Sequence, residues 1–419
     1  MTNIINAFRS LGVQFSSPIQ RMMTASRYVN PVLLTAGDEE GAATNTVATL
    51  TAIGADSTTD YDLFTTDDYP DNGELFTVYG GIKIPRDPDY PDQGWQVKAT
   101  TYDTVHHYPR VNGWRVSFLT DAPAFDIWGP LSTVTGIRVL VDGRFVSRTV
   151  TMSSRTSGGI YDWFHVVLPA SGLPRRYRRI DIEQSDAQSA FRGIALPSGY
   201  LPMPIQTTER YRIAVYGDSF GEGTGTTIAE GGSSAGFGNV AGYLLGGVDL
   251  DIVQMALGGT GFINTNGSVG NFLDHIDDLD AQPIDEVWIE GGINDAYPSN
   301  TVAAITAAAL AFFQAVRAKL PNAPIVVLGI ARTDAANAAT TEDAVKAAFD
   351  YWADMNSMFI PFQTTGAKLF NGSNSDDSVA SNFSANAYGG GRDGTDNTHP
   401  NRKGHQYMAE YIAARRRAM

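Results

Sequence analysis

The chain has 419 residues, of which 43% are hydrophobic and 18% are charged, a composition typical of a globular protein with a sizeable core. Its 45 acidic and 30 basic side chains give a formal net charge of −15, which disfavours binding to nucleic acid or to an anionic membrane surface. The chain contains no cysteine, so disulfides, thiolate metal sites and thiol catalysis are excluded.

The first residues carry no recognisable targeting signal. Residues 1–9 lack a basic stretch followed by an apolar one, so we expect no signal peptide and synthesis in the cytoplasm. Residues 1–40 fit neither of the two patterns that follow. We interpret them as an N-terminal arm that is helical, flexible or partner-binding.

Residues 41–208 contain short β-prone runs separated by turn residues. The clearest runs are 113–119, Gly136–Val141 and 161–168. Asp142 and Gly143 follow the second run and favour a hairpin turn, because both positions tolerate positive φ. Strands at this spacing, without long helical segments between them, predict an all-β sandwich. We interpret the arginine-rich run 175–179 as solvated surface, with an anion contact as the alternative.

The pattern changes near residue 208, where Pro202 and Pro204 mark a linker. Residues 1–208 contain 17 basic and 21 acidic side chains, whereas residues 209–419 contain 13 and 24. We therefore predict two domains after the arm, 41–208 and 209–419.

Strand and helix patterns alternate from residue 211 onward. Apolar runs of strand length occupy Tyr211–Tyr216, 251–256, 284–290 and 325–330. Helical patterns occupy 301–320, 341–358 and 401–418, with Pro400 suited to the first turn of the last one. Near-continuous apolar strands that alternate with helices predict a parallel sheet covered on both faces. Thr306 and Gln314 interrupt the most apolar helix, so we expect no membrane span.

Polar and glycine-rich motifs follow three of these strands and precede the last helix. They are Gly217-Asp218-Ser219-Phe220, 256–261, Gly291-Gly292-Ile293-Asn294-Asp295 and Asp396-Asn397-Thr398-His399-Pro400. Open parallel sheets bind ligands beyond the carboxyl ends of their strands, so the motifs should converge on one crevice. A serine, an imidazole base and amide donors are together the groups that acyl transfer requires.

The four motifs resemble the signature of the SGNH, or GDSL-type, hydrolases over about residues 209–419. This resemblance implies a flavodoxin-like, three-layer α/β/α hydrolase domain. It also implies that Ser219 is the nucleophile, that His399 is its base and that Asp396 orients the histidine. Asp393 is a rival partner for His399, and Asp396 is favoured by the family spacing.

The same resemblance implies an oxyanion hole formed by Ser219, Gly259 and Asn294. The second motif departs from the family pattern, because its usual asparagine is replaced by Met255 or Ala256. Gly261 also fits as the oxyanion glycine under a shifted alignment.

A second serine motif needs a separate interpretation. Residues 232–236 match the G-x-S-x-G pattern of α/β-hydrolases, which requires a strand that leads into a sharp turn. The residues before this motif make no convincing strand. We therefore interpret it as a loop without a catalytic role.

Residues 136–205 resemble, in layout and short phrases, the jelly-roll domain that precedes the hydrolase domain in carbohydrate esterase family 2 acetyl esterases. The phrases are 136–143, 179–183 and 191–196. This resemblance implies an O-acetylated saccharide substrate and a sandwich that forms or flanks the cleft. Four tryptophans could stack on sugar rings, although we favour core packing for each: Trp95, Trp114, Trp128 and Trp163.

These observations predict a carboxylic ester hydrolase that removes small acyl groups, above all acetyl, from O-acylated carbohydrate. We expect no metal or organic cofactor, no nucleic-acid partner and no membrane insertion. One alternative is a lipid esterase or thioesterase, and another is a non-catalytic carbohydrate-binding or structural module of the phage-tail type. Residues 1–40 could bind a second copy of the chain or a virion partner.

Overall fold

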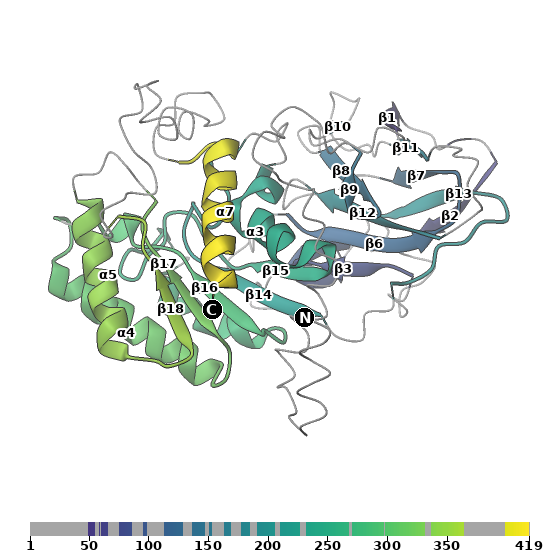
Figure 1. Cartoon of the computed structure of the whole chain (residues 1–419). Helices are drawn as coiled ribbons and strands as arrows, with labels where there is room; N and C mark the ends of the chain where they lie inside the picture. Colours follow the sequence, from purple (N-terminus) through teal and green to yellow (C-terminus); the bar gives the residue numbers. More distant parts are fainter. Residues whose placement is uncertain are drawn as a thin grey trace.

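A computed structural model of the chain contains two domains that lie side by side, a β-sandwich and an α/β domain (Figure 1). The structure describes residues 49–54, 58, 60–65, 75–85, 95–98, 113–128, 136–146, 151–152, 163–168, 177–184, 191–205, 210–226, 232–267, 270–296, 298–331, 337–363 and 399–418. The predicted arm at 1–40 and the predicted boundary at residue 208 lie outside the described residues. Both stay predictions.

The sandwich consists of two antiparallel sheets and a separate hairpin. The first sheet has the order β1-β11-β7-β13-β2, with β1 (Thr49–Gly54), β2 (Tyr61–Thr65), β7 (Ala124–Trp128), β11 (Trp163–Val167) and β13 (Gly193–Pro197). The second has the order β10-β8-β12-β6-β3, with β3 (Thr77–Tyr79), β6 (Arg115–Thr120), β8 (Gly136–Val141), β10 (Thr151–Met152) and β12 (Arg178–Gln184). The strand β9 (Arg144–Phe145) pairs with β8, and β4 (Ile82–Pro85) pairs with β5 (Trp95–Lys98).

Alternating side chains build the core between the two sheets. Val116 and Phe118 of β6 point inward and are fully buried. The Phe118 ring packs edge-on against Phe125 of the other sheet, with ring centroids 5.7 Å apart. The predicted hairpin turn is confirmed, since Asp142 and Gly143 have φ values of 51° and 77° between β8 and β9.

The α/β domain contains a five-stranded parallel sheet with the order β15-β14-β16-β17-β18. Its strands are β14 (Tyr211–Tyr216), β15 (Leu250–Gln254), β16 (Glu286–Ile289), β17 (Ile325–Leu328) and β18 (Ser357–Ile360). In chain order this is 2-1-3-4-5, the flavodoxin-like arrangement that the resemblance to the SGNH hydrolases implies. The switch in strand order lies between β14 and β16, which positions the ligand crevice there.

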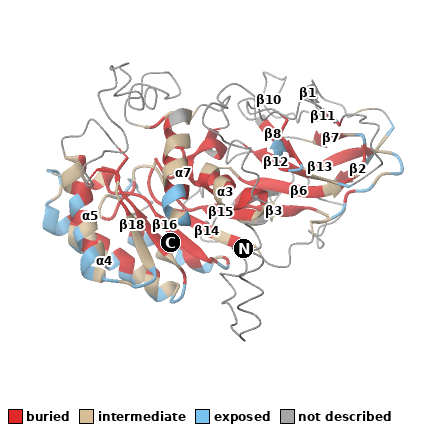
Figure 2. Cartoon of the chain, in the orientation of Figure 1, coloured by how far each residue is buried: buried red, intermediate tan, exposed pale blue. Residues whose placement is uncertain are grey.

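Helices cover both faces of this sheet and make three layers (Figure 1). The helices are α3 (Phe237–Gly246), α4 (Val302–Lys319), α5 (Ala338–Trp352) and α7 (Arg402–Arg417), with 3₁₀ segments η5 (Gly232–Ala235), η6 (Gly247–Asp249), η8 (Phe272–Asp280) and η9 (Ile293–Asp295). Ile213 and Val215 of β14 pack toward α3 and α7, whereas Ala214 and Tyr216 pack toward α4, α5 and η8. Figure 2 shows the strands buried and the outer faces of α4 and α5 exposed.

The predicted helix at 341–358 is wrong at its C-terminal end. The helix α5 ends at Trp352, and the strand β18 begins at Ser357. Ala353 terminates the helix with a left-handed φ of 51°, a conformation that the sequence does not signal because no glycine is present. The guanidinium of Arg317 binds Asp354 with an Nε–Oδ2 distance of 2.7 Å and so holds the turn in place.

The last helix begins slightly later than the sequence pattern suggests. Asn401 is the N-cap of α7, and its side chain accepts a hydrogen bond from the backbone N–H of Gly404. Pro400 therefore precedes the cap instead of occupying the first turn.

Within the described residues, α4 is the one helix that is long and apolar enough to cross a membrane. Its apolar side chains instead face the sheet, where Ile305, Phe312 and Phe313 are fully buried. The remaining face of the helix is largely alanine, which explains its high mean hydropathy.

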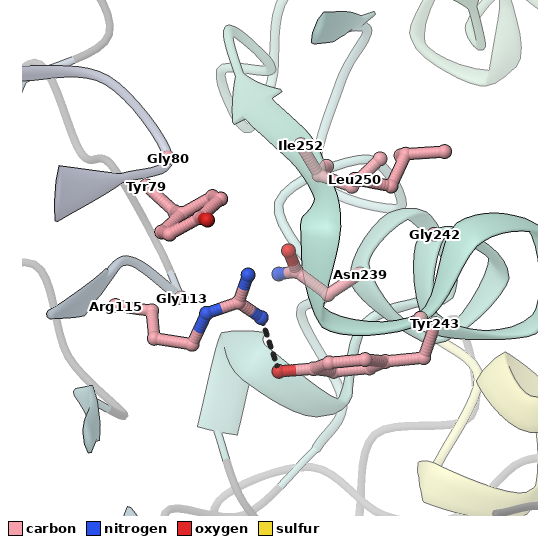
Figure 3. Close-up of a pocket in the computed structure, with 10 residues that line it drawn as sticks. Tyr79, Gly80, Gly113, Arg115, Asn239, Gly242, Tyr243, Leu250 and Ile252 are labelled. Carbon is pink, nitrogen blue, oxygen red and sulfur yellow. Dashed lines mark hydrogen bonds between the residues drawn. The ribbon is translucent and has the colours of Figure 1, made fainter. Parts of the chain in front are cut away.

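The outward face of the second sandwich sheet is polar but buried, because the α/β domain covers it. These side chains are less than 7% exposed: Arg115, Ser117, Arg138, Asp181 and Glu183. Arg115 donates to the hydroxyl of Tyr243 in α3 at 2.9 Å, and Figure 3 shows the two side chains facing each other beside a small pocket lined by both domains. Tyr243 in turn donates to Glu183. The domain interface is therefore built on hydrogen bonds and ion pairs as well as apolar contact.

The interpretation of the run 175–179 as solvated surface is wrong for Arg179. This residue lies in β12, and its guanidinium binds Asp181 and Asp249 and donates to the carbonyl of Val248 at 2.8 Å. Asp181 is fully buried and also binds Arg115 at 3.3 Å. One carboxylate therefore holds two arginines at the interface.

Replacing Asp181 by alanine should destabilise the protein, because two buried guanidinium groups would lose their shared carboxylate. We expect the free energy of unfolding in urea to fall by about 3–5 kcal/mol. The control is Asp350→Ala, which removes an exposed carboxylate that pairs with Lys346 within α5. It should change stability by no more than about 0.5 kcal/mol. Equal losses in the two variants would contradict the prediction.

Candidate active site

Ser219 lies in a tight loop directly after β14. Hydrogen bonds within the loop shape it: for example, the Phe220 N–H donates to Asp218 Oδ1 at 3.0 Å, and the Thr224 N–H donates to the Ser219 carbonyl at 3.0 Å. Gly217 permits the close approach of the loop to β16, because a Cβ there would lie 2.5 Å from the Glu290 carbonyl oxygen. The loop therefore presents Ser219 at the carboxyl end of the sheet.

His399 lies against Ser219, although the two are 180 residues apart in the chain. Its Nε2 is 2.8 Å from Ser219 Oγ, within hydrogen-bond reach. The segment that carries His399 packs on Gly225, where a Cβ would lie 2.9 Å from His399 Cβ. Asp396 and its rival Asp393 lie outside the described residues, so their assignment stays a prediction.

A second histidine, His405 in α7, has a structural role. Its Nδ1 accepts a hydrogen bond from the Phe237 N–H at 3.3 Å, and its Nε2 lies 3.0 Å from the Thr224 carbonyl oxygen. Burial lowers the pKa of His405 to about 4, so the ring stays neutral and donates from Nε2. It fixes α7 to the loop that carries Ser219.

The loop after β15 brings Gly258 and Gly259 to the same place. A Cβ on Gly258 would lie 3.5 Å from Ser219 Cβ, so this backbone is adjacent to the serine. Asn264 donates from Nδ2 to the Gly259 carbonyl, and Asn266 donates to the Gly258 carbonyl, both at 2.7 Å. These two asparagines orient the glycine peptides. The sequence alone does not single out Asn264 and Asn266, because nothing in their spacing marks them.

The same loop distinguishes the two glycines that compete for the oxyanion role. The N–H of Gly261 is already used, since it donates to the Asn264 carbonyl at 3.0 Å. Gly261 also packs on Asp295, where a Cβ would lie 2.5 Å from the carboxylate oxygens. Among the described residues, the N–H of Gly259 has no such acceptor, and its φ of 78° requires glycine. The geometry therefore favours Gly259.

Asn294 reaches the site from the loop after β16. Its Nδ2 donates to the Thr260 carbonyl at 2.8 Å, which orients the amide and leaves a second N–H on the same nitrogen. The neighbouring Asp295 is buried and accepts hydrogen bonds from the backbone N–H groups of residues 262–264 at 2.7–3.0 Å. Asp295 therefore braces the glycine loop against β16.

Two buried carboxyls lie beneath the serine loop. Asp218 and Glu290 are 0% and 1% exposed. Burial raises the pKa of Asp218 to about 7, and burial together with the charge of Asp218 raises the pKa of Glu290 well above its usual range. The sequence patterns do not single out Glu290.

The remaining candidate residues lie away from this constellation. Ser234, in the second serine motif, donates to the Gln184 carbonyl at 3.0 Å at the domain interface and belongs to η5, not to a loop. Trp114 is fully buried in the core of the sandwich. Trp128 and Trp163 stack on each other with ring centroids 5.1 Å apart, and the side chain of Trp95 lies outside the described residues.

One family model matches the α/β domain of this chain. Residues 215–407 match the model of the GDSL-like Lipase/Acylhydrolase family. No curated protein is similar enough in sequence to match the chain.

Solved structures that share the two-domain fold have low sequence identity. A family two carbohydrate esterase from Clostridium thermocellum is 16% identical, with a TM-score of 0.54 over 82% of this chain and 98% of that chain. An acetyl xylan esterase from the rumen bacterium Butyrivibrio proteoclasticus is 14% identical, with a TM-score of 0.52 over 89% and 98%. A salicylyl-acyltransferase from a tetracycline biosynthetic pathway is 17% identical, with a TM-score of 0.56 over 82% and 95%.

These likenesses establish the fold of both domains, and the family model covers the segment that brings Ser219, Gly259, Asn294 and His399 together. Residues 215–407 of this chain are a domain of the GDSL-like lipase/acylhydrolase family, preceded by a β-sandwich as in the family two carbohydrate esterases.

Proposed function

We propose that this protein is a serine esterase that removes acetyl groups from O-acetylated carbohydrate. The observation that carries the proposal is the 2.8 Å approach of His399 Nε2 to Ser219 Oγ at the carboxyl end of the parallel sheet. An imidazole in this position can take the hydroxyl proton, which makes the serine a nucleophile. Support comes from the two strands that flank β14, since Gly259 follows β15 and Asn294 follows β16, and Asn294 donates to the carbonyl of Thr260 beside Gly259.

The reaction proceeds in two steps. Ser219 Oγ attacks the ester carbonyl carbon while His399 accepts the serine proton, and a tetrahedral oxyanion forms. The backbone N–H groups of Ser219 and Gly259 and the Nδ2–H of Asn294 donate to the oxyanion. The intermediate releases the sugar hydroxyl, which takes the proton from His399 and leaves an acyl-serine. Water then attacks the acyl-serine, with His399 again as base, and acetate leaves.

The substrate class rests on the architecture of the whole chain. Both domains align with carbohydrate esterases, including an acetyl xylan esterase. A lipid esterase or thioesterase would share the chemistry but would favour long acyl chains. A non-catalytic binding module would keep the fold and show no turnover. Association with a virion stays a prediction that concerns residues 1–40.

Hydrolysis of p-nitrophenyl acetate, butyrate and octanoate should be fastest for acetate and fall steeply with chain length. Ser219→Ala should lower kcat on acetate by about 10⁴-fold or more, because the nucleophile is lost. Ser234→Ala is the matched control, and it should keep the wild-type rate because Ser234 only donates to a backbone carbonyl. Preference for octanoate would move the substrate class to lipid. Turnover that is indifferent to Ser219 would overturn the site.

Replacing Asn294 by alanine should remove one of the three oxyanion donors. We expect kcat to fall by about 10²–10³-fold with little change in KM, since the lost hydrogen bond forms only as the oxyanion develops. Asn356→Ala removes an exposed amide that donates to the Asn322 carbonyl and should leave both constants unchanged. A rise in KM at constant kcat would instead assign Asn294 to substrate binding.

A further inference from the structure

Glu290 connects the two loops that carry Ser219 and Asn294. It directly follows β16 and precedes the Gly291–Asn294 segment, while its backbone N–H donates to the Tyr216 carbonyl at 2.8 Å. Gly217 packs directly on it, since a Cβ there would lie 3.1 Å from Glu290 Oε2. The side chain therefore lies beneath the serine loop and not in solvent.

The Glu290 carboxyl lies against the serine loop and close to Asp218. A Cβ on Gly291, the residue after Glu290, would lie 3.8 Å from Asp218 Oδ2, so the two acidic residues approach each other from neighbouring loops. The Oε2 of Glu290 and the Oδ2 of Asp218 are both buried, and within the part of the chain that the structure describes neither accepts a hydrogen bond. Two ionised carboxylates buried in this arrangement would repel each other.

A single proton bound to Glu290 would remove this repulsion between the two carboxylates. When Glu290 is protonated, its O–H donates to Asp218, and the repulsion becomes a hydrogen bond. Asp218 then accepts from Glu290 and from the Phe220 N–H, and both contacts stabilise its negative charge. Two further carboxyls act on the pair: Glu222 in the same loop and Asp295 after β16. They favour retention of the proton.

We propose that Glu290 is a positioning residue that acts as a neutral carboxylic acid, which joins the serine loop to the loop of the oxyanion asparagine through a proton shared with Asp218. The proposal rests on the function proposed above and deepens it. Glu290 touches no reacting atom. Its effect is to hold Ser219 and Asn294 at a constant separation while charge develops between them.

The sign of the pH dependence follows from the raised pKa values. In the unfolded chain such carboxyls titrate near pH 4, whereas folding raises the pKa of Asp218 to about 7 and that of Glu290 well above its usual range. Over this window the folded protein holds more protons than the unfolded chain, so its stability falls as pH rises. Glutamine at position 290 keeps the hydrogen-bonding groups but cannot ionise, so it should remove the part of this fall that belongs to Glu290.

The test compares Glu290→Gln and Glu290→Leu with the wild type in the full-length chain. Glu290→Gln should keep kcat on p-nitrophenyl acetate within about threefold of wild type. Its melting temperature should exceed that of the wild type by a margin that grows from about pH 5 to about pH 9. Glu290→Leu should lower kcat by about 10²-fold with little change in KM, because the serine loop loses its anchor.

Three results would overturn the proposal. Loss of activity in Glu290→Gln equal to that in Glu290→Leu would mean that an ionised carboxylate is needed. Wild-type kcat in Glu290→Leu would mean that the residue only fills space. An unchanged pH dependence of the melting temperature in Glu290→Gln would mean that Glu290 holds no proton. This measurement can be made even if Glu290→Leu does not fold.

A fluorophosphonate probe separates this inference from the proposed function. The probe labels an activated serine whatever the natural ester, so its rate of reaction with Ser219 reports loop position directly. A wild-type protein that reacts with neither probe nor ester would refute the esterase. The melting curves would then still decide whether Glu290 holds the shared proton.

Discussion

Parallel pairing of β14 with both β15 and β16 is the constraint on which the site depends. Parallel strands end at the same edge of a sheet, so the loops after these three strands meet although they are far apart in the chain. The strand order places β14 between β15 and β16. The loop of Ser219 therefore lies between the loops of Gly259 and Asn294, and the segment before α7 needs only to bring His399 to the same edge. A different strand order would separate these groups without changing any of them.

The polar groups of the site are held by other polar groups and not by packing alone. Asp295 binds the backbone of the glycine loop, Asn264 and Asn266 orient the glycine peptides, and Glu290 underlies the serine loop. Donors that are fixed in advance stabilise developing charge without the cost of reorganisation. The supporting hydrogen bonds come mainly from side chains to backbone, so the geometry is tied to the main chain of three loops.

Much of the α/β domain was predictable, because its strands are continuous apolar runs and its motifs follow them. The predicted strand Tyr211–Tyr216 has the bounds of β14 itself. The turn after Trp352 was not predictable, since it depends on a left-handed alanine and on an ion pair from Arg317 in another helix. The role of Glu290 was not predictable either. A single acidic residue at the end of an apolar strand has no recognisable pattern, and its proximity to Asp218 is a tertiary contact.

The polar interface between the domains has a consequence for anyone who recombines such proteins. Arg115, Arg179 and Glu183 alternate with apolar residues as they would on a strand that faces water, yet they are matched to Tyr243 and Asp249 of the α/β domain. A chimaera that joined this hydrolase domain to the sandwich of another protein would bury mismatched charges at the domain interface. The second sandwich sheet and the α3–η6 region therefore have to be kept together in any domain exchange. The junctions of a chimaera should lie outside both.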